Sequence, residues 1–325
     1  MDFDLTGVQA SWQEKGESLG RELARDVAAA NVIMGAARVG LLDPKADLLA
    51  VAVAVEAMAC ESPSAAVIFA LHSGTALAVA GDERFSSFFH GETVVAVGLS
   101  SDDVPREEGG LLSGRAAWVA PITAHGVAVV GPRRGEERAA YAVALDVPGV
   151  AIEEVRTAAL PGLVCGHVTF TGAASTPIGA TLPVMTRIRV LMAAAGLGIG
   201  RRALREALTT ARAAHTAAAG EQTVQGLLAD AATELDAAML MTWKAALSVG
   251  AMASPLSLAD ASLAKLAVTG AAQRAVERAT QVVGVDSFQR GHIIERLAQD
   301  VRALELFAGR TEALRAAAAE GLPPR

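Results

Sequence analysis

The side chains that most often carry out chemistry are scattered along this sequence. Its two cysteines, Cys60 and Cys165, are far apart and form no C-x-x-C motif, which indicates two buried, reduced thiols. The six histidines are His72, His90, His125, His167, His215 and His292. They show no spacing typical of metal ligands, so we interpret them as surface or packing residues and expect no metal site.

A glycine-rich run at Gly196, Gly198 and Gly200 partly resembles a dinucleotide-binding loop. The full G-x-G-x-x-G pattern needs its last glycine where Arg201 stands, and no strand precedes the run. We interpret these glycines as a close contact between two helices.

Composition narrows the class of protein. Of 325 residues, 52% are hydrophobic but only 4% are aromatic, and the abundance of alanine favours closely packed helices. The net charge of −7 argues against binding to nucleic acid or to an anionic membrane surface. The apolar stretch 48–59 is short for a membrane span and contains Glu56. Because the first residues are acidic and include no basic leader, we expect a cytoplasmic protein.

Residues 1–92 are predicted to form an N-terminal helical bundle. Thr6 is a suitable N-cap for a helix that starts at Gly7. Two further segments, 47–59 and 63–80, are rich in alanine and valine on most faces, which predicts helices at the centre of the bundle.

Residues 93–180 change to the short, β-branched runs that are typical of strands. These runs occur at 94–98, 126–131, 140–145 and 167–170, with breaks rich in glycine, proline and aspartate between them. The pattern predicts a small central antiparallel β domain.

Residues 181–325 return to helical periodicity and predict a C-terminal four-helix bundle. The four segments are expected at 185–217, 222–250, 257–284 and 292–319. Helices, then strands, then helices do not alternate, which argues against a doubly wound nucleotide-binding sheet. The predicted fold class is therefore α+β, mostly α.

Several motifs, taken in order along the chain, resemble those of the acyl-CoA dehydrogenases. They include the Leu-His-Ser stretch around His72, the strand segment around Trp118, and the segments 222–230, 279–284 and 295–315. Their order and spacing carry the resemblance over nearly the whole chain. It implies the same succession of helical bundle, β domain and four-helix bundle.

The resemblance also implies FAD, bound between the β domain and the C-terminal bundle, as the group that does the hydride chemistry. Trp118 would lie against the isoalloxazine ring, where an indole offers apolar stacking area. The alternative is that Trp118 is a core aromatic of the β domain. Ala120 replaces the threonine that usually forms a hydrogen bond near the flavin, which leaves only a backbone N–H for that role.

Other flavin contacts of the family are altered. Ala211 stands where an arginine usually meets the diphosphate, and Arg212, one residue away, is either a substitute or a solvated surface side chain. Gln281 and Gly284 match the segment that approaches the adenine end of FAD in a neighbouring subunit.

The catalytic base is the largest departure from the family. Its usual position, a glutamate in a Tyr-Glu-Gly turn, is Ala308 here, and a methyl group cannot accept a proton. Some members carry the base on an earlier helix, and that position is Ile188. Glu305 is close in sequence but is expected to face solvent.

These losses favour one function over two others. The leading hypothesis is a subunit without the usual base, paired with a catalytic acyl-CoA dehydrogenase subunit in a heterotetramer that shares FAD and binds an acyl-CoA. The second is a stand-alone flavin enzyme, with a homo-oligomer as the alternative assembly, and with different chemistry such as oxygen activation. The third is a non-catalytic assembly protein.

Overall fold

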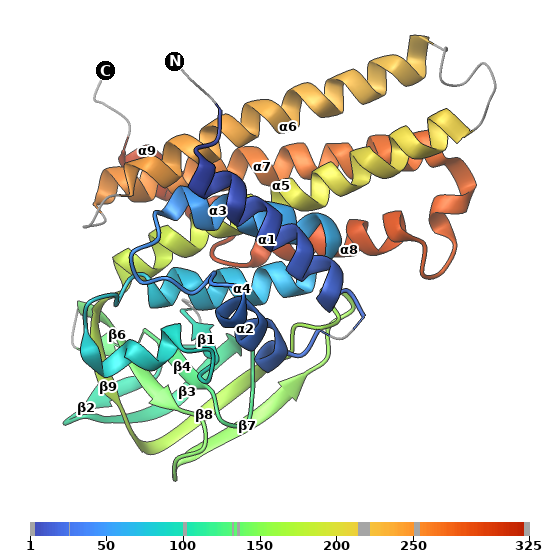
Figure 1. Cartoon of the computed structure of the whole chain (residues 1–325). Coiled ribbons are helices and arrows are strands. Elements are labelled where there is room, and N and C mark those ends of the chain that lie inside the picture. The colour runs from blue at the N-terminus through green and yellow to red at the C-terminus, as the bar shows by residue number, and fades with distance from the viewer. Residues whose placement is uncertain are drawn as a thin grey trace.

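The computed structural model describes residues 4–25, 27–99, 103–131, 133–134, 137–213, 222–249 and 254–321, so His215 lies outside the described residues. Helices occupy one side of the molecule and a β region the other (Figure 1). The N-terminal helices are α1 (Gly7–Leu23), α2 (Ala29–Arg38), α3 (Leu48–Glu61), α4 (Pro63–Ala76) and the 3₁₀ helix η1 (Glu83–Phe89). The strands are β1 (Val95–Gly98), β2 (Arg106–Glu108), β3 (Leu111–Val119), β4 (Val127–Val130), β5 (Arg133–Arg134), β6 (Glu137–Ala144), β7 (Val150–Val155), β8 (Cys165–Ala174) and β9 (Thr176–Ala180). The C-terminal helices are α5 (Thr181–Ala213), α6 (Gln222–Ser248), α7 (Pro255–Val283), η3 (Gly284–Phe288), α8 (Ile293–Leu306) and α9 (Thr311–Glu320).

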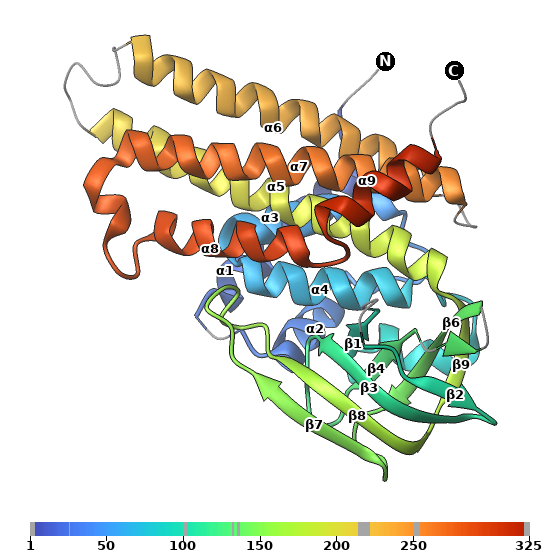
Figure 2. The ribbon, with the colours of Figure 1, turned by 180° about the vertical axis from the view of Figure 1, so that it is seen from behind.

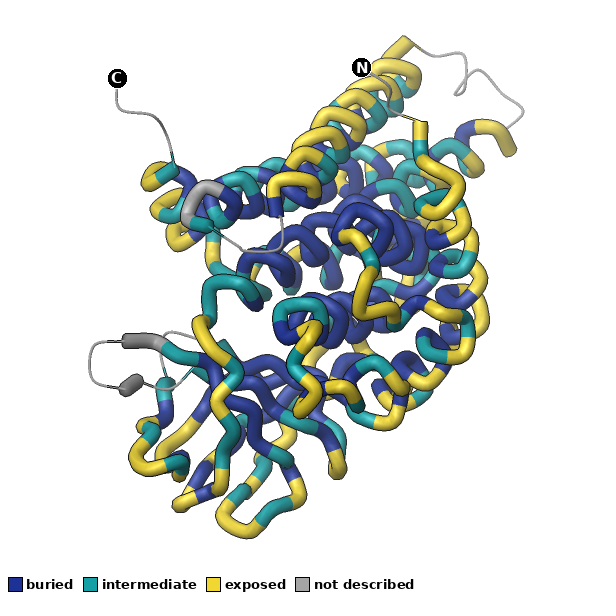
Figure 3. The backbone as a smooth tube through the Cα atoms, turned by 60° about the vertical axis from the view of Figure 1, so that its left-hand side comes forward, coloured by how far each residue is buried: buried dark blue, intermediate teal, exposed yellow. Residues whose placement is uncertain are grey.

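The predicted helix starts and central helices are confirmed. Thr6 forms a capping box with Gln9 at the start of α1, and the Asp47 side chain accepts a hydrogen bond from the Ala50 N–H at the start of α3. Nearly every residue of α3 and α4 is buried, because α1 and α5 pack on α3 while α5 and the β region enclose α4 (Figure 3). Their lack of a polar face thus follows from their place in the middle of the molecule.

The β region is mostly antiparallel, with two exceptions. Its main strand order is β1-β4-β6-β5-β2-β3-β8-β7, and β9 pairs with β6. However, β1 runs parallel to β4, with Val95 opposite Val127, and β2 runs parallel to β5. The prediction of a purely antiparallel domain is therefore wrong, and the sheet is mixed. The reason is that β1 enters directly from the helical bundle and lies at the edge of the sheet beside β4.

The C-terminal bundle differs from the prediction at its last segment. The stretch expected as one helix over 292–319 is two helices, α8 and α9, which meet at a turn (Figure 2). Ala308 and Gly309 have φ angles of 59° and 121°, values that no right-handed helix contains. The chain therefore changes direction at the segment where the family's base position falls.

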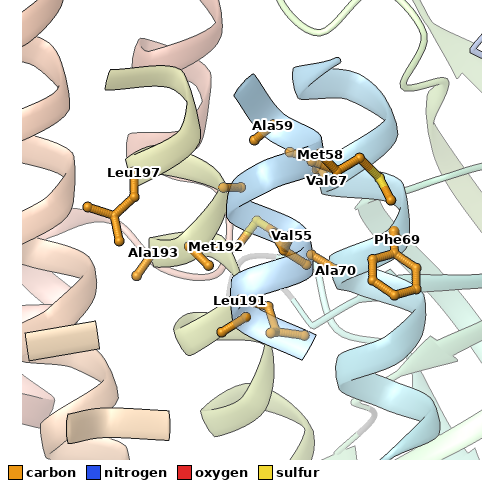
Figure 4. Close-up of a cluster of buried hydrophobic side chains, with 14 of the residues drawn as sticks. Val55, Met58, Ala59, Val67, Phe69, Ala70, Leu191, Met192, Ala193 and Leu197 are labelled. Carbon is orange, nitrogen blue, oxygen red and sulfur yellow. The ribbon is translucent and has the colours of Figure 1, made fainter. Parts of the chain in front are cut away.

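The long helix α5 is the centre of the molecule. It is long and apolar enough to span a membrane, but 83% of its most apolar window is buried inside the protein. Its glycines make the close helix contacts predicted for them: a Cβ on Gly198 would lie 2.3 Å from the Glu56 O of α3. Figure 4 shows the side chains of Leu191 and Met192 from α5 packed near Val55 of α3.

His72 connects α4 to the β region. Its Nε2 donates to the Phe88 O at 2.7 Å, and its Nδ1 accepts from the Val95 N–H at 3.2 Å. One nitrogen donates and the other accepts, so the ring is neutral and carries its proton on Nε2. Burial lowers the pKa of His72 to about 4, against the opposing effect of the bond to Phe88.

We predict a pH-dependent loss of stability that originates at His72. The unfolded chain takes up a proton on this histidine near pH 6.5, whereas the folded chain resists it until about pH 4. The contribution of the neutral His72 to the free energy of unfolding is therefore complete above pH 6.5. This contribution falls by about 3 kcal/mol as the pH drops to 4. In His72→Gln, the free energy of unfolding from chemical denaturation should be lower at pH 7.5 but should decline less between pH 6.5 and 4.

The matched control is His125→Gln, since the His125 side chain is 86% exposed. Asp300, whose pKa is raised to about 6 by burial, contributes with the opposite sign but is present in all three proteins. Equal pH dependence in wild type and His72→Gln would show that another group is responsible.

Candidate functional site

The turn between α8 and α9 holds the first predicted base position. Ala308 is partly buried and adopts a left-handed backbone conformation, with φ of 59°. Such a conformation is strained for any residue with a Cβ, so surrounding contacts must maintain it.

Two buried cations supply those contacts. Arg189 of α5 donates from Nε to the Ala308 O at 3.1 Å and from Nη1 to the Ser262 Oγ at 2.8 Å. Lys265 of α7 donates from Nζ to the Gly309 O at 3.0 Å and to the Glu305 O at 3.2 Å. The turn is thus anchored through its carbonyl oxygens, without help from the side chain of residue 308.

The charge on Lys265 is strongly affected by this environment. Burial, together with the charge of the nearby Arg189, lowers the pKa of Lys265 to about 7, while Glu305 opposes the shift. Sequence reasoning assigned no role to either cation. The available signal was two basic residues inside alanine-rich helical segments, which must find partners when buried.

The expectation that Glu305 faces solvent is wrong. Its carboxylate accepts hydrogen bonds from the Gln273 Nε2 at 3.0 Å and from the Thr311 Oγ1 at 3.1 Å. These bonds join α7 and the start of α9 to α8. The carboxylate is therefore engaged in holding the turn and is a poor substitute for the missing base.

The second predicted base position, Ile188, is closed by packing. Its side chain is 1% exposed, and a Cβ on Gly74 of α4 would lie 2.9 Å from its Cγ1. A carboxylate here would be buried against α4 and would favour its neutral form. Neither position provides a proton acceptor.

Trp118 lies on the surface of the β region. Its side chain belongs to β3, the residue is 53% exposed, and its backbone φ is 55°. The indole meets the ring of His167 edge-on, with centroids 5.6 Å apart. The alternative interpretation of Trp118 as a core aromatic is therefore wrong.

Ala120 offers no free backbone group. It is 1% exposed, its N–H donates to the Val97 O at 3.2 Å, and its O accepts from the Val97 N–H at 2.7 Å. The suggestion that its N–H replaces the family's threonine hydroxyl fails, because a bridge to β1 already uses that donor.

The remaining predicted flavin contacts lie far from Trp118. Arg212 is exposed in the last turn of α5, next to the buried Ala211. Gln281 is exposed near the end of α7, and Gly284 ends that helix with φ of 76°. The C-terminal ends of α5 and α7 lie at the end of the bundle away from the β region (Figures 1 and 2). One chain therefore does not bring these residues together with Trp118.

Within the described residues, no three His, Cys, Asp or Glu side chains are grouped so that they could hold a metal ion. Cys60 and Cys165 are both buried, and burial raises the pKa of Cys60 to about 12 and that of Cys165 to about 11. Reactive thiolates are not expected from such environments.

Comparison with known proteins places this geometry in context. Residues 179–322 match the family described as acyl-CoA dehydrogenase, C-terminal domain. A segment of 186 residues is 30% identical to 3-sulfinopropanoyl-CoA desulfinase of Paraburkholderia xenovorans (strain LB400), covering 52% of this chain and 47% of that protein. The chain thus spans about half the length of this curated relative.

Two solved structures resemble the whole fold. Butyryl-CoA dehydrogenase from Megasphaera elsdenii superposes with a TM-score of 0.87 at 16% identity, covering 98% of this chain and 99% of that one. PigA with FAD and proline superposes with a TM-score of 0.86 at 17% identity, covering 98% of each chain. At these identities, the superpositions establish the fold alone.

We predict that Ala308→Gly does not destabilise the protein and can stabilise it by up to ~1 kcal/mol. Glycine removes the left-handed strain at this position, which offsets its larger conformational entropy in the unfolded chain. The matched control is Ala298→Gly within α8, which should cost about 1 kcal/mol of helix stability. Equal losses of unfolding free energy for the two variants would contradict the strained geometry of the turn.

Proposed function

We propose that this chain, whose residues 179–322 match the acyl-CoA dehydrogenase C-terminal domain, is a base-less, flavin-binding subunit that acts with a catalytic acyl-CoA dehydrogenase subunit. In this complex, FAD would accept the hydride taken from an acyl-CoA. The observation that carries the proposal is the α8–α9 turn, which Arg189 and Lys265 hold in place although Ala308 has no carboxylate. The turn is held through its backbone oxygens, and residue 308 offers no proton acceptor.

The fit to FAD is partial and favours a shared site. The exposed indole of Trp118 offers a stacking surface on the β region, which suits an isoalloxazine ring. Gln281, Gly284 and Arg212 lie at the opposite end of the bundle and would serve a flavin seated on another subunit. A complete set of contacts therefore requires at least two chains.

A catalytic partner would supply what this chain lacks. The proton next to the thioester must be removed by a base within hydrogen-bond reach. Ala308 cannot remove it, Ile188 is sealed against Gly74, and the Glu305 carboxylate is bonded to Gln273 and Thr311. In an oligomer of unlike subunits, the partner's own active site would perform this step.

A stand-alone flavin enzyme with other chemistry is the second candidate. The similarity to 3-sulfinopropanoyl-CoA desulfinase and to PigA with FAD and proline favours it, because a desulfinase and a protein solved with proline indicate other uses of this scaffold. Such an enzyme would need FAD but no base at residue 308.

We predict that the chain purified alone lacks the flavin absorbance band and gains it when co-expressed with a catalytic subunit of the family from the same organism. The physical reason is that Trp118 lies on β3, whereas Gln281 and Gly284 lie at the C-terminal end of α7, which is away from the β region. The measurement is the absorbance spectrum of the purified protein and complex. In the complex, Trp118→Ala should lower the flavin content, whereas Trp243→Ala, on α6, serves as the matched control.

A yellow homo-oligomer that consumes oxygen without acyl-CoA turnover would instead support the stand-alone enzyme. Absence of flavin and acyl-CoA from every complex would leave only an assembly role and would contradict the proposal.

We predict that Ala308→Glu alone does not create dehydrogenase activity in the isolated chain. The substitution restores a carboxylate, but the Ala120 N–H remains engaged in the sheet and the distant flavin contacts remain unfilled. Acyl-CoA-dependent reduction of an electron-accepting dye measures the outcome, with Ala308→Gln as a control of equal size without a base. Robust turnover by Ala308→Glu but not by Ala308→Gln would show that the base was the single missing part.

A further inference from the structure

Strand β3 contains a bulge directly opposite His167 of β8. Ala116 pairs with Val168 and Val119 pairs with Gly166, so three steps along β3 correspond to two steps along β8. Ala117 and Trp118 therefore both face the single residue His167. A bulge of this kind leaves one backbone N–H without a ladder partner and redirects a side chain.

The His167 ring fills the gap that the bulge leaves in the hydrogen-bond ladder. Its Nδ1 accepts a hydrogen bond from the Trp118 N–H at 3.4 Å, and its edge contacts the indole at an interplanar angle of 77°. Because Nδ1 accepts, the neutral ring carries its proton on Nε2. The same side chain thus engages both the backbone and the ring of Trp118.

We infer that His167 is the positioning residue for Trp118: it caps the bulge, fixes the indole in its outward orientation and so presents it to a bound ligand. This inference rests on the proposed function in one respect, that the ligand is the flavin ring. The positioning itself is a property of the isolated chain. It follows from the two-against-one register, the hydrogen bond and the edge contact.

The geometry makes this arrangement dependent on the protonation of His167. A proton on Nδ1 removes the lone pair that accepts the Trp118 N–H, so the cap is lost in the imidazolium form. The charged groups near His167 in the strand register are Glu153, its cross-strand partner on β7, and Arg115 on β3, which pairs with Thr169 two residues further along β8. Arg115 lies 3.9 Å from the Glu153 carboxylate and 3.2 Å from that of Asp103, just before β2.

Trp118 emission in the full-length chain tests the inference without any flavin. Subtracting the spectrum and the anisotropy signal of Trp118→Phe isolates this residue from Trp12 and Trp243. His167→Asn keeps an acceptor near the Nδ1 position that cannot be protonated, and His167→Leu removes the acceptor. His125→Asn, an exposed histidine outside the bulge, is the matched control. Thermal unfolding of each variant establishes that it is folded.

At pH 8, we expect a high anisotropy of Trp118 in the wild type, in His125→Asn and in His167→Asn, and a low anisotropy in His167→Leu. Wild-type anisotropy in His167→Leu, or equally low values in the asparagine and leucine variants, would overturn the inference. Because no flavin is present, these outcomes are independent of whether a complex later proves to bind FAD.

Discussion

The close approach of α5 to α3 is the contact on which the rest of the molecule depends. At Gly198 there is no room for a Cβ, so the two backbones meet without an intervening side chain. Salt bridges from α5 border this contact: Arg201 binds Glu56 at 2.5 Å, and Arg205 binds Glu61 at 2.7 Å. Burial raises the pKa of Glu56, and the positive charge of Arg201 acts against that shift. Arg201 therefore stabilises the ionised form of Glu56. Through α5, the N-terminal helices and the C-terminal bundle share one core.

The α8–α9 turn of the candidate site is held in place by side chains from two helices of this core. Arg189 leaves α5 nine residues before Gly198 and reaches the α8–α9 turn, while Lys265 reaches the same turn from α7. Both act on backbone oxygens, so the turn does not depend on which side chain occupies position 308. An alanine at the position where the resemblance implies a carboxylate is therefore compatible with this fold, since the side chain of residue 308 is not needed to hold the turn.

Much of the architecture was predictable from sequence because it is locally encoded. The cap at Thr6, the apolar helices over 47–59 and 63–80, and the order of helices and strands all follow from short-range patterns. The break at Ala308 was not predictable from helical periodicity, because alanine favours a helix and the bonds that hold the turn, such as those from Arg189 and Lys265, come from residues distant in sequence.

The candidate site was less predictable than the fold, because it also depends on contacts between residues that are distant in sequence. Family motifs indicated Trp118, but its exposure depends on a bulge that exists only in the pairing with β8. The engagement of the Glu305 carboxylate and of the Ala120 N–H likewise depends on partners distant in sequence. Sequence motifs indicate candidate site residues, whereas contacts between helices and strands determine which polar groups of those residues are already engaged.

The separation of Trp118 from Gln281 and Gly284 has a consequence for stoichiometry. Under the proposed function, Trp118 on the β region and Gln281 and Gly284 at the end of α7 would contribute to two different cofactor sites, each completed by a neighbouring chain. When the neighbours are unlike, the two sites would differ in composition. An assembly with flavin in one kind of site alone would carry one flavin for every two chains.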